Sequence, residues 1–243
     1  MMPGSPVTII TGGSSGIGAA TARRLLERGH RVMIIGRDPE RLARTAKELG
    51  TSRPLLTFAG NVSDHESVAL AVQRTIDEFG RLDVAISSAG FAPLSHRDPP
   101  HGYGDITEGD PASWSEMVLT NVLGPALLIN ATLPALKQTR GRIVLIGAVA
   151  GITHTPGNIY GVTKFAVTAL AENTRRKVTS DKVGVTLIVP GRVDTPFWDP
   201  HGGVPAEFNL TADQVAGCID WAISQPDDVD VSTVIVRPKG QAS

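Results

Sequence analysis

The feature that most constrains the fold is a regular alternation of short apolar runs with longer stretches that suit a helix. The runs are continuously apolar, which is typical of strands that are covered on both faces. They are Val7–Thr11, Val32–Ile35, Leu55–Phe58, Val84–Ser87, Ile143–Ile146, Val185–Val189 and Val234–Val236, and a helix-compatible stretch follows every run except the last. This order is typical of βαβ units and predicts a parallel sheet.

Six helices are expected, at residues 17–28, 39–49, 64–79, 114–136, 160–178 and 212–224. Asp38, which precedes a proline, and Asp64 look like N-terminal caps. Seven strands and six helices predict a doubly wound α/β fold in three layers, with helices on both faces of the parallel sheet. No linker divides the 243 residues, so residues 1–243 are expected to form a single domain.

Two segments, residues 91–113 and 192–211, follow predicted strands and show no periodicity over most of their length. Both are rich in proline, glycine and histidine, so they are expected to be loops. Open α/β folds bind their ligands at the carboxyl edge of the sheet, where these loops lie. We therefore expect them to form the substrate side of a site. Its wall would be partly aromatic, from His96, His101, Tyr103, Phe197 and Trp198.

Charge and cysteine content exclude several classes of protein. The net charge of -1 provides no overall field for nucleic acid or an anionic membrane. The single cysteine, Cys218, excludes an internal disulfide framework and suits a cytoplasmic location. No histidine pair has metal-ligand spacing, so no metal is expected. The uncharged stretch 117–136 contains two asparagines and two prolines, which favours a buried helix over a membrane span.

A glycine-rich turn joins the first predicted strand to the first predicted helix. It reads Thr11-Gly12-Gly13-Ser14-Ser15-Gly16-Ile17-Gly18. Glycines let the backbone approach a pyrophosphate, and the free N–H groups at the start of the helix supply positive potential. The turn therefore predicts a Rossmann-type dinucleotide-binding domain.

Two other motifs overlap this turn. A phosphate-binding P-loop would need Lys-Ser/Thr after the last glycine, where this chain has Ala19-Ala20. Residues 12–16 also match the G-x-S-x-G nucleophile elbow of hydrolases, with Ser14 as nucleophile and His201 as a possible triad partner. Only one strand precedes Ser14, however, whereas a hydrolase elbow normally follows several. The hydrolase hypothesis therefore ranks far behind dinucleotide binding.

Tyr160 and Lys164 open the helix that follows the fifth predicted strand, and residues four apart share one helix face. An ammonium group close to a phenol favours the phenolate. Such a pair can exchange a proton with a substrate at neutral pH. On its own the pair is a weak signal, because most such matches are a half-buried tyrosine beside a solvated lysine.

Taken together, the motifs resemble the short-chain dehydrogenase/reductase family over nearly the whole chain. They are the glycine turn, Ala89-Gly90, Asn121, Tyr160-x-x-x-Lys164 and Pro190-Gly191-x-Val193-x-Thr195. The resemblance implies that Tyr160 is the acid/base, that Lys164 holds the nicotinamide ribose, and that Asn121 anchors a proton-relay water. It also implies a homodimer or homotetramer assembled through the helices at 114–136 and 160–178.

The cofactor implied is NADP, with NAD as a possibility. Gly36 occupies the position where the family usually has an acidic residue that binds the ribose of NAD, and Arg37 next to it suits a 2′-phosphate. Asp38 could instead turn toward the ribose. The residues expected to contact the cofactor are Gly12, Ser14, Ser15, Gly16, Ile17, Gly18, Arg37, Asn61, Val62, Ser88, Ala89, Gly90, Tyr160, Lys164, Pro190, Gly191, Val193 and Thr195.

The chain departs from the family pattern at three places. Ala148 stands where the family usually has a serine that binds the substrate oxygen, and losing one such donor typically costs about 10²–10³ in turnover. Ser88 replaces an asparagine that ties strands together, and Asn61 replaces an aspartate near the adenine. Substitutes for the missing serine could come from Ser88, Thr153, His154 or Thr155.

These observations favour an NADP-dependent oxidoreductase that moves a hydride between the nicotinamide and a small carbonyl or alcohol substrate. Tyr160 would transfer the proton. The alternative is a dinucleotide-binding protein of the same fold with little or no redox activity, which the alanine at position 148 motivates.

Overall fold

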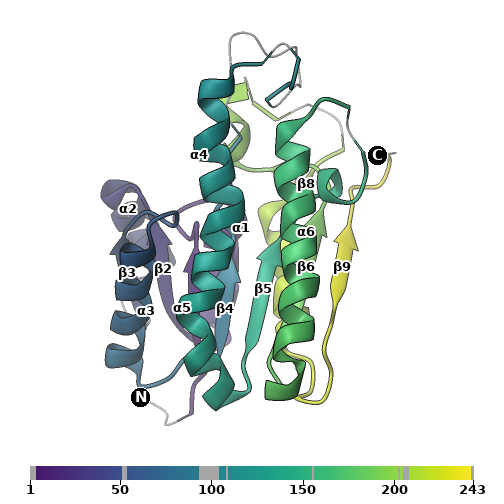
Figure 1. The fold of residues 1–243 in the computed structure, drawn as a ribbon. Helices are drawn as coiled ribbons and strands as arrows, with labels where there is room; N and C mark the ends of the chain where they lie inside the picture. The colour runs from purple at the N-terminus through teal and green to yellow at the C-terminus, as the bar shows by residue number, and fades with distance from the viewer. Residues whose placement is uncertain are drawn as a thin grey trace.

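The computed structural model describes residues 4–50, 54–92, 104–107, 109–154, 156–201, 203–204 and 208–241. Its centre is a seven-stranded parallel sheet with the strand order β3-β2-β1-β4-β5-β6-β9 (Figure 1). The strands are β1 (Val7–Thr11), β2 (Arg31–Gly36), β3 (Leu55–Ala59), β4 (Val84–Ser87), β5 (Arg142–Ile146), β6 (Gly184–Pro190) and β9 (Thr233–Val236). The strand order reverses between β1 and β4, and open α/β sheets bind their ligands at such a point. The predicted fold class is confirmed.

Helices cover both faces of this sheet. Figure 1 shows α3 (His65–Phe79), α4 (Trp114–Val118), α5 (Gly124–Thr139) and α6 (Ile159–Val178) on the viewer's side. The opposite face carries α1 (Gly16–Glu27), α2 (Pro39–Leu49) and α7 (Ala212–Ile223), and α1 packs closely against α7. The helix starts follow from their caps, because Asp38 accepts hydrogen bonds from two backbone N–H groups of α2 and Asp64 from one of α3.

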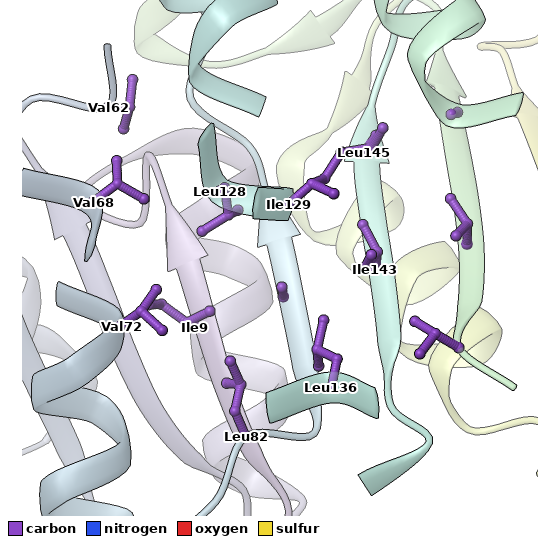
Figure 2. Close-up of a cluster of buried hydrophobic side chains, with 14 of the residues drawn as sticks. Ile9, Val62, Val68, Val72, Leu82, Leu128, Ile129, Leu136, Ile143 and Leu145 are labelled. Carbon is purple, nitrogen blue, oxygen red and sulfur yellow. The ribbon is translucent and has the colours of Figure 1, made fainter. Parts of the chain in front are cut away.

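Two apolar cores lie on the two faces of the sheet. Successive side chains of a strand point to opposite faces, so Ile9 joins the core under α3 and α5, whereas Ile10 joins the core under α1 and α7. Figure 2 shows the first core, which includes Leu128 and Leu136 from α5 and Ile143 from β5. Both faces of the sheet are therefore apolar, which explains why the strands read as continuous runs in the sequence.

The helix predicted over 114–136 is interrupted. A π-helical turn, η2 (Leu119–Leu123), separates α4 from α5, and α5 continues to Thr139. Pro125 has no N–H, so it cannot donate an α-helical hydrogen bond to the carbonyl of Asn121, four residues earlier. The predicted helix is therefore present, but it is not α-helical throughout, because the proline disrupts the hydrogen-bond ladder.

The segments predicted as loops contain short elements. A 3₁₀ turn, η1 (Pro111–Ser113), precedes α4, and another, η5 (Pro196–His201), follows β6. Two further strands, β7 (Val193–Asp194) and β8 (Leu210–Thr211), pair in parallel. The described residues therefore form nine strands rather than the seven expected. The indole N–H of Trp198 donates to the carbonyl of Val193 and holds η5 against β7. The predicted substrate-side residues 93–103, 108, 202 and 205–207 lie outside the described residues.

The continuous helical region Pro111–Thr139 is long and apolar enough to cross a membrane by length and composition alone. Met117, Leu128 and Leu136 in this region are fully buried inside the domain. Val118, Leu119 and Leu123 are 38% to 44% exposed, so the region packs into the core along one face only. The expectation of a buried helix over 117–136 holds for that face.

Candidate active site

A cleft of about 1150 Å³ opens at the carboxyl edge of the sheet. Most of the residues expected to contact a cofactor line it: Gly12, Ser14, Ser15, Gly16, Ile17, Arg37, Val62, Ser88, Ala89, Gly90, Tyr160, Lys164, Pro190, Gly191, Val193 and Thr195. Gly18, Asn61 and Asn121 do not line it. The fold thus brings together segments that are up to 183 residues apart in the sequence, from Gly12 to Thr195.

The glycine turn packs too closely for side chains. Gly12 has a φ of 69°, and a Cβ there would lie 2.7 Å from the Cα of Ala89. A Cβ on Gly18 would lie 2.3 Å from the carbonyl oxygen of Gly12, so this glycine shapes the turn from behind. The buried hydroxyl of Thr45 donates to the carbonyl of Ser14 at 2.8 Å and ties the turn to α2. The result is exposed backbone at the start of α1, where a phosphate group can bind.

The segment after β4 forms the floor of the cleft. The N–H of Ser88 donates to the carbonyl of Thr11 at 3.1 Å, so a backbone bond ties these two strand ends together. This bond uses backbone atoms alone, so it does not depend on which side chain stands at position 88. Asn61, beside the cleft, uses its side-chain oxygen to accept from the N–H and hydroxyl of Ser63.

Asn121 is fully buried in the π-helical turn, and its side chain connects Phe91 to Thr163. Its side-chain nitrogen donates to the carbonyl of Phe91 and to the hydroxyl of Thr163, at 2.8 and 3.1 Å. Its side-chain oxygen accepts from the N–H of Phe91 at 2.8 Å. These bonds fix the segment after β4 against α6, which carries the tyrosine and the lysine. Thr163 was not singled out from the sequence, since its position inside the motif carries no separate signal.

Tyr160 and Lys164 both face the cleft from the first turns of α6. Asn158 caps this helix by accepting from the N–H of Gly161 at 2.9 Å. The ammonium nitrogen of Lys164 lies 5.6 Å from the centre of the Tyr160 ring and donates to the carbonyl of Ile146 at 3.1 Å. Burial lowers the pKa of Lys164 from 10.5 to about 8. The sequence spacing correctly predicted the shared face, and the structure adds that the lysine is buried rather than solvated.

Ala148 lines the cleft at the end of β5, so the position of the missing serine is part of the site. The hydroxyl of Thr153 donates to the carbonyl of Val149, and the ring of His154 stacks on Phe165 with centroids 5.2 Å apart. Thr155 lies outside the described residues. Of the four substitutes considered, Ser88 is the one that lines the cleft within the described chain.

The end of the cleft at β2 is rich in arginine, with Arg37, Arg41 and Arg44 in its lining. Asp38 also lines this end, and its side chain caps α2. Its carboxylate accepts from the N–H groups of Arg41 and Glu40, which hold its pKa below the usual value. Arg41 and Arg44 were missed from the sequence, although their spacing of three residues places them on one face of the predicted helix.

The opposite end of the cleft is aromatic. The ring of Phe197 lies 5.8 Å from the ring of Tyr160 and meets the ring of Trp198 edge-on. The expected aromatic contribution of Phe197 and Trp198 is present, whereas His96, His101 and Tyr103 are outside the described residues. Such a wall suits a substrate that is at least partly apolar.

Neither a metal site nor a hydrolase triad emerges from the described part of the chain. No group of three or more histidine, cysteine, aspartate or glutamate residues that could hold a metal is found there. Ser14, the alternative nucleophile, lies in the glycine turn next to Gly36, with its side chain against the end of β2. His201 belongs to η5, and its side chain is not described.

Comparison with known proteins identifies close relatives over the full length. The short chain dehydrogenase family model matches residues 6–202. An uncharacterized oxidoreductase of Staphylococcus saprophyticus is 35% identical over 237 residues, covering 96% of this chain and 97% of that protein. Serine 3-dehydrogenase of Agrobacterium fabrum is 32% identical over 250 residues, covering 98% and 96%. A solved alcohol dehydrogenase from the archaeon Thermococcus sibiricus, complexed with 5-hydroxy-NADP, has a TM-score of 0.85 and 27% identity, covering 98% of this chain and 99% of that one.

Proposed function

The chain belongs to the short-chain dehydrogenase family of oxidoreductases, and we propose that it uses NADP to interconvert a carbonyl and an alcohol on a small, partly apolar substrate. The observation that carries this proposal is the buried Lys164 beside Tyr160 in the cleft that the glycine turn opens. Burying an ammonium group is costly, and sites that keep one usually use it.

The residues of the cleft fit a dinucleotide. The crowded glycines leave room for a pyrophosphate against the backbone, which a side chain at Gly12 would obstruct. Ser14, Ser15 and Val62 line the same cleft, and Val62 would contact the adenine. Pro190, Val193 and Thr195 would cover the nicotinamide end. Bound NADPH would supply the hydride for reduction of the substrate carbonyl carbon.

Tyr160 performs the proton transfer in this proposal. During carbonyl reduction its hydroxyl gives a proton to the substrate oxygen as negative charge develops there, and in the reverse direction the phenolate accepts it. The positive charge of Lys164, 5.6 Å from the ring centre, stabilises the phenolate. Phe197, packed near the tyrosine ring, would narrow the water-filled space around the reacting atoms.

In this proposal Asn121 contributes its backbone carbonyl rather than its side chain. Its side chain is engaged by Phe91 and Thr163, and Pro125 cannot donate the α-helical bond to its carbonyl. We propose this carbonyl as the acceptor for a water that passes protons between Lys164 and solvent. The lysine nitrogen and the side-chain oxygen of Asn121 both lie beside Gly90, at 3.7 and 3.8 Å from the position that a Cβ would take there, so Lys164 and Asn121 are near neighbours.

NADP is proposed over NAD because the ribose end of the cleft is lined by arginines. Arg37 follows the glycine that replaces the usual acidic residue, and Asp38 is occupied in capping α2. An arginine fork binds a phosphate group better than a ribose hydroxyl. The Thermococcus sibiricus relative was solved with an NADP derivative, which agrees with this preference.

We also propose that the enzyme works as a homodimer or homotetramer in the cytoplasm, where the lone Cys218 would stay reduced. Val118, Leu119 and Leu123 are 38% to 44% exposed on the long helix, and Val162 of α6 is 61% exposed. Covering such side chains in a subunit contact stabilises an oligomer. Size-exclusion chromatography with light scattering tests this, and a monomer at micromolar concentration would overturn it.

The reaction is tested by a screen of aldehydes and ketones, both aliphatic and aromatic, with NADPH and with NADH. Loss of nicotinamide absorbance reports turnover, and calorimetry reports cofactor binding separately. We expect turnover of at least one carbonyl class with a preference for NADPH. Cofactor binding without turnover of any compound, in either direction, would favour the dinucleotide-binding protein without redox activity.

A further inference from the structure

One ion pair crosses the arginine-rich end of the cleft between distant parts of the chain. The Nη1 atom of Arg37, just after β2, donates to a carboxylate oxygen of Glu116 in α4. The guanidinium carbon of Arg37 also lies 5.9 Å from the centre of the Phe91 ring, just after β4. Figure 1 shows that α4 extends beyond the carboxyl ends of the strands, which places Glu116 at the same edge as the cleft.

Two other arginines at this end are paired differently. Arg41 and Arg44 have carboxylate partners within their own helical turns, Asp38 and Glu40, at 3.9 and 4.0 Å. These distances exceed that of a hydrogen bond. Arg37 is hydrogen-bonded to a carboxylate 79 residues away in the sequence and stands over an aromatic ring. Its guanidinium is therefore oriented by contacts that a bound anion would have to replace or share.

Glu116 competes with a 2′-phosphate for the same donor group. Both ligands are anions, and a carboxylate and a phosphate each bind a guanidinium through its N–H fork. A cofactor with a free ribose diol offers no anion in exchange for Glu116. The consequence of the competition therefore falls on NADPH and much less on NADH.

We propose that Glu116 is a specificity-determining residue that limits the preference for NADPH by holding Arg37. The inference rests on the proposed function, since it concerns the cofactor of that reaction. Both side chains of the pair are more than half exposed, at 58% and 52%, so the competition is modest. An exposed pair of this kind corresponds to about a two- to fivefold effect on affinity.

The test is to measure dissociation constants of NADPH and NADH by calorimetry for the wild type and for Glu116→Gln. We expect the ratio of NADPH to NADH affinity to rise about two- to fivefold, mainly through tighter NADPH binding. Glu40→Gln is the matched control, because it removes the same charge from a partner of Arg44. Its effect on the ratio should be clearly smaller.

Glu116→Gln is also tested in an Arg37→Ala background. This double variant separates competition for Arg37 from a general effect of the lost charge. Glu116→Gln should then leave the ratio unchanged, because the shared donor is gone. An equal rise in that background, or an equal effect of the Glu40 control, would overturn the proposal. Wild-type protein that binds neither cofactor would instead refute the proposed function, whereas binding of both with no effect of Glu116→Gln refutes this inference alone.

Discussion

Lys164 destabilises the folded protein because it is buried, and it also takes part in the proposed reaction. It is 6% exposed, and burial lowers its pKa to about 8. Below pH 8 the folded protein must keep a charged ammonium away from water. Between about pH 8 and 10.5 the unfolded chain binds a proton that the folded chain does not, so this group's contribution to the free energy of unfolding rises with pH.

Lys164→Met should therefore stabilise the protein while abolishing turnover. Keeping the charged ammonium of Lys164 buried costs about 3 kcal/mol of stability at neutral pH. The variant avoids this cost but loses the hydrogen bond to Ile146, which is worth about 1 kcal/mol. At pH 7 we expect the free energy of unfolding of the variant to exceed that of the wild type by about 1–2 kcal/mol. This difference should disappear by pH 10.5. Urea denaturation across this range measures it, with the exposed Lys177→Met as control. A gain that does not depend on pH would contradict the account.

Arg37 is expected to determine the cofactor. Arg37→Ala should weaken NADPH binding about 10- to 100-fold, the range of one charge-assisted hydrogen bond, and leave NADH binding nearly unchanged. Calorimetric dissociation constants for both cofactors provide the measurement. A wild type that prefers NADH, or a variant with the same preference as the wild type, would show that Arg37 does not contact the 2′-phosphate.

Ala148 tests whether the site lacks a hydrogen-bond donor. Ala148→Ser adds a hydroxyl to a residue that lines the cleft, so we expect turnover to rise, by up to about 10²-fold. Steady-state kinetics measure this. Ala150→Ser is the control, because it adds a hydroxyl on the same turn at a residue that does not line the cleft. A fall in turnover with intact folding would mean that the substrate needs the small side chain.

The residues of the site were predictable to the extent that they belong to local patterns. The glycine turn and the Tyr160–Lys164 pair are such patterns, and the structure brings them to one cleft. Glu116 and Thr45 escaped the sequence analysis because each contacts a partner at least 31 residues away. No periodicity or spacing in the sequence encodes those contacts.

Among the elements, the turn between β1 and α1 depends most strictly on its residues. Gly12→Ala should cost more stability than Gly29→Ala, although both glycines have a positive φ. A Cβ on Gly12 would meet backbone atoms at 2.7 Å, whereas one on Gly29 would meet nothing within 4 Å. Strain alone costs about 1 kcal/mol, so we expect a difference of more than about 1 kcal/mol in urea denaturation. Equal losses would show that the close approach is not structurally important.

Element boundaries were predictable where a cap or a turn residue marks them, as at Asp38 and Asp64. The π-helical turn was not predicted, although Pro125 marks the place where the α-helical hydrogen-bond ladder loses a donor. The two-residue strands β7 and β8 are too short to show a period of two. Their pairing joins Val193 to Leu210, 17 residues apart in the sequence.

At the scale of the whole molecule, the fold follows from one property of the sequence. Strands that are apolar on both faces require helices on both sides, and the βα alternation supplies them in an order that gives a parallel sheet. The carboxyl edge then collects the segments after β1, β2, β4, β5 and β6 into one cleft. The substrate is not encoded in this way, because it depends on loop side chains rather than on the alternation.

The central claim is that this cleft is a redox site in which Tyr160 transfers the proton. The most direct test compares wild type and Tyr160→Phe for NADPH-dependent reduction of the best substrate from the screen, with NADPH affinity measured in parallel. We predict that turnover falls by at least about 10²-fold while the dissociation constant of NADPH stays nearly the same, because the ring still packs near Phe197. A variant that retains most of its turnover would contradict the account.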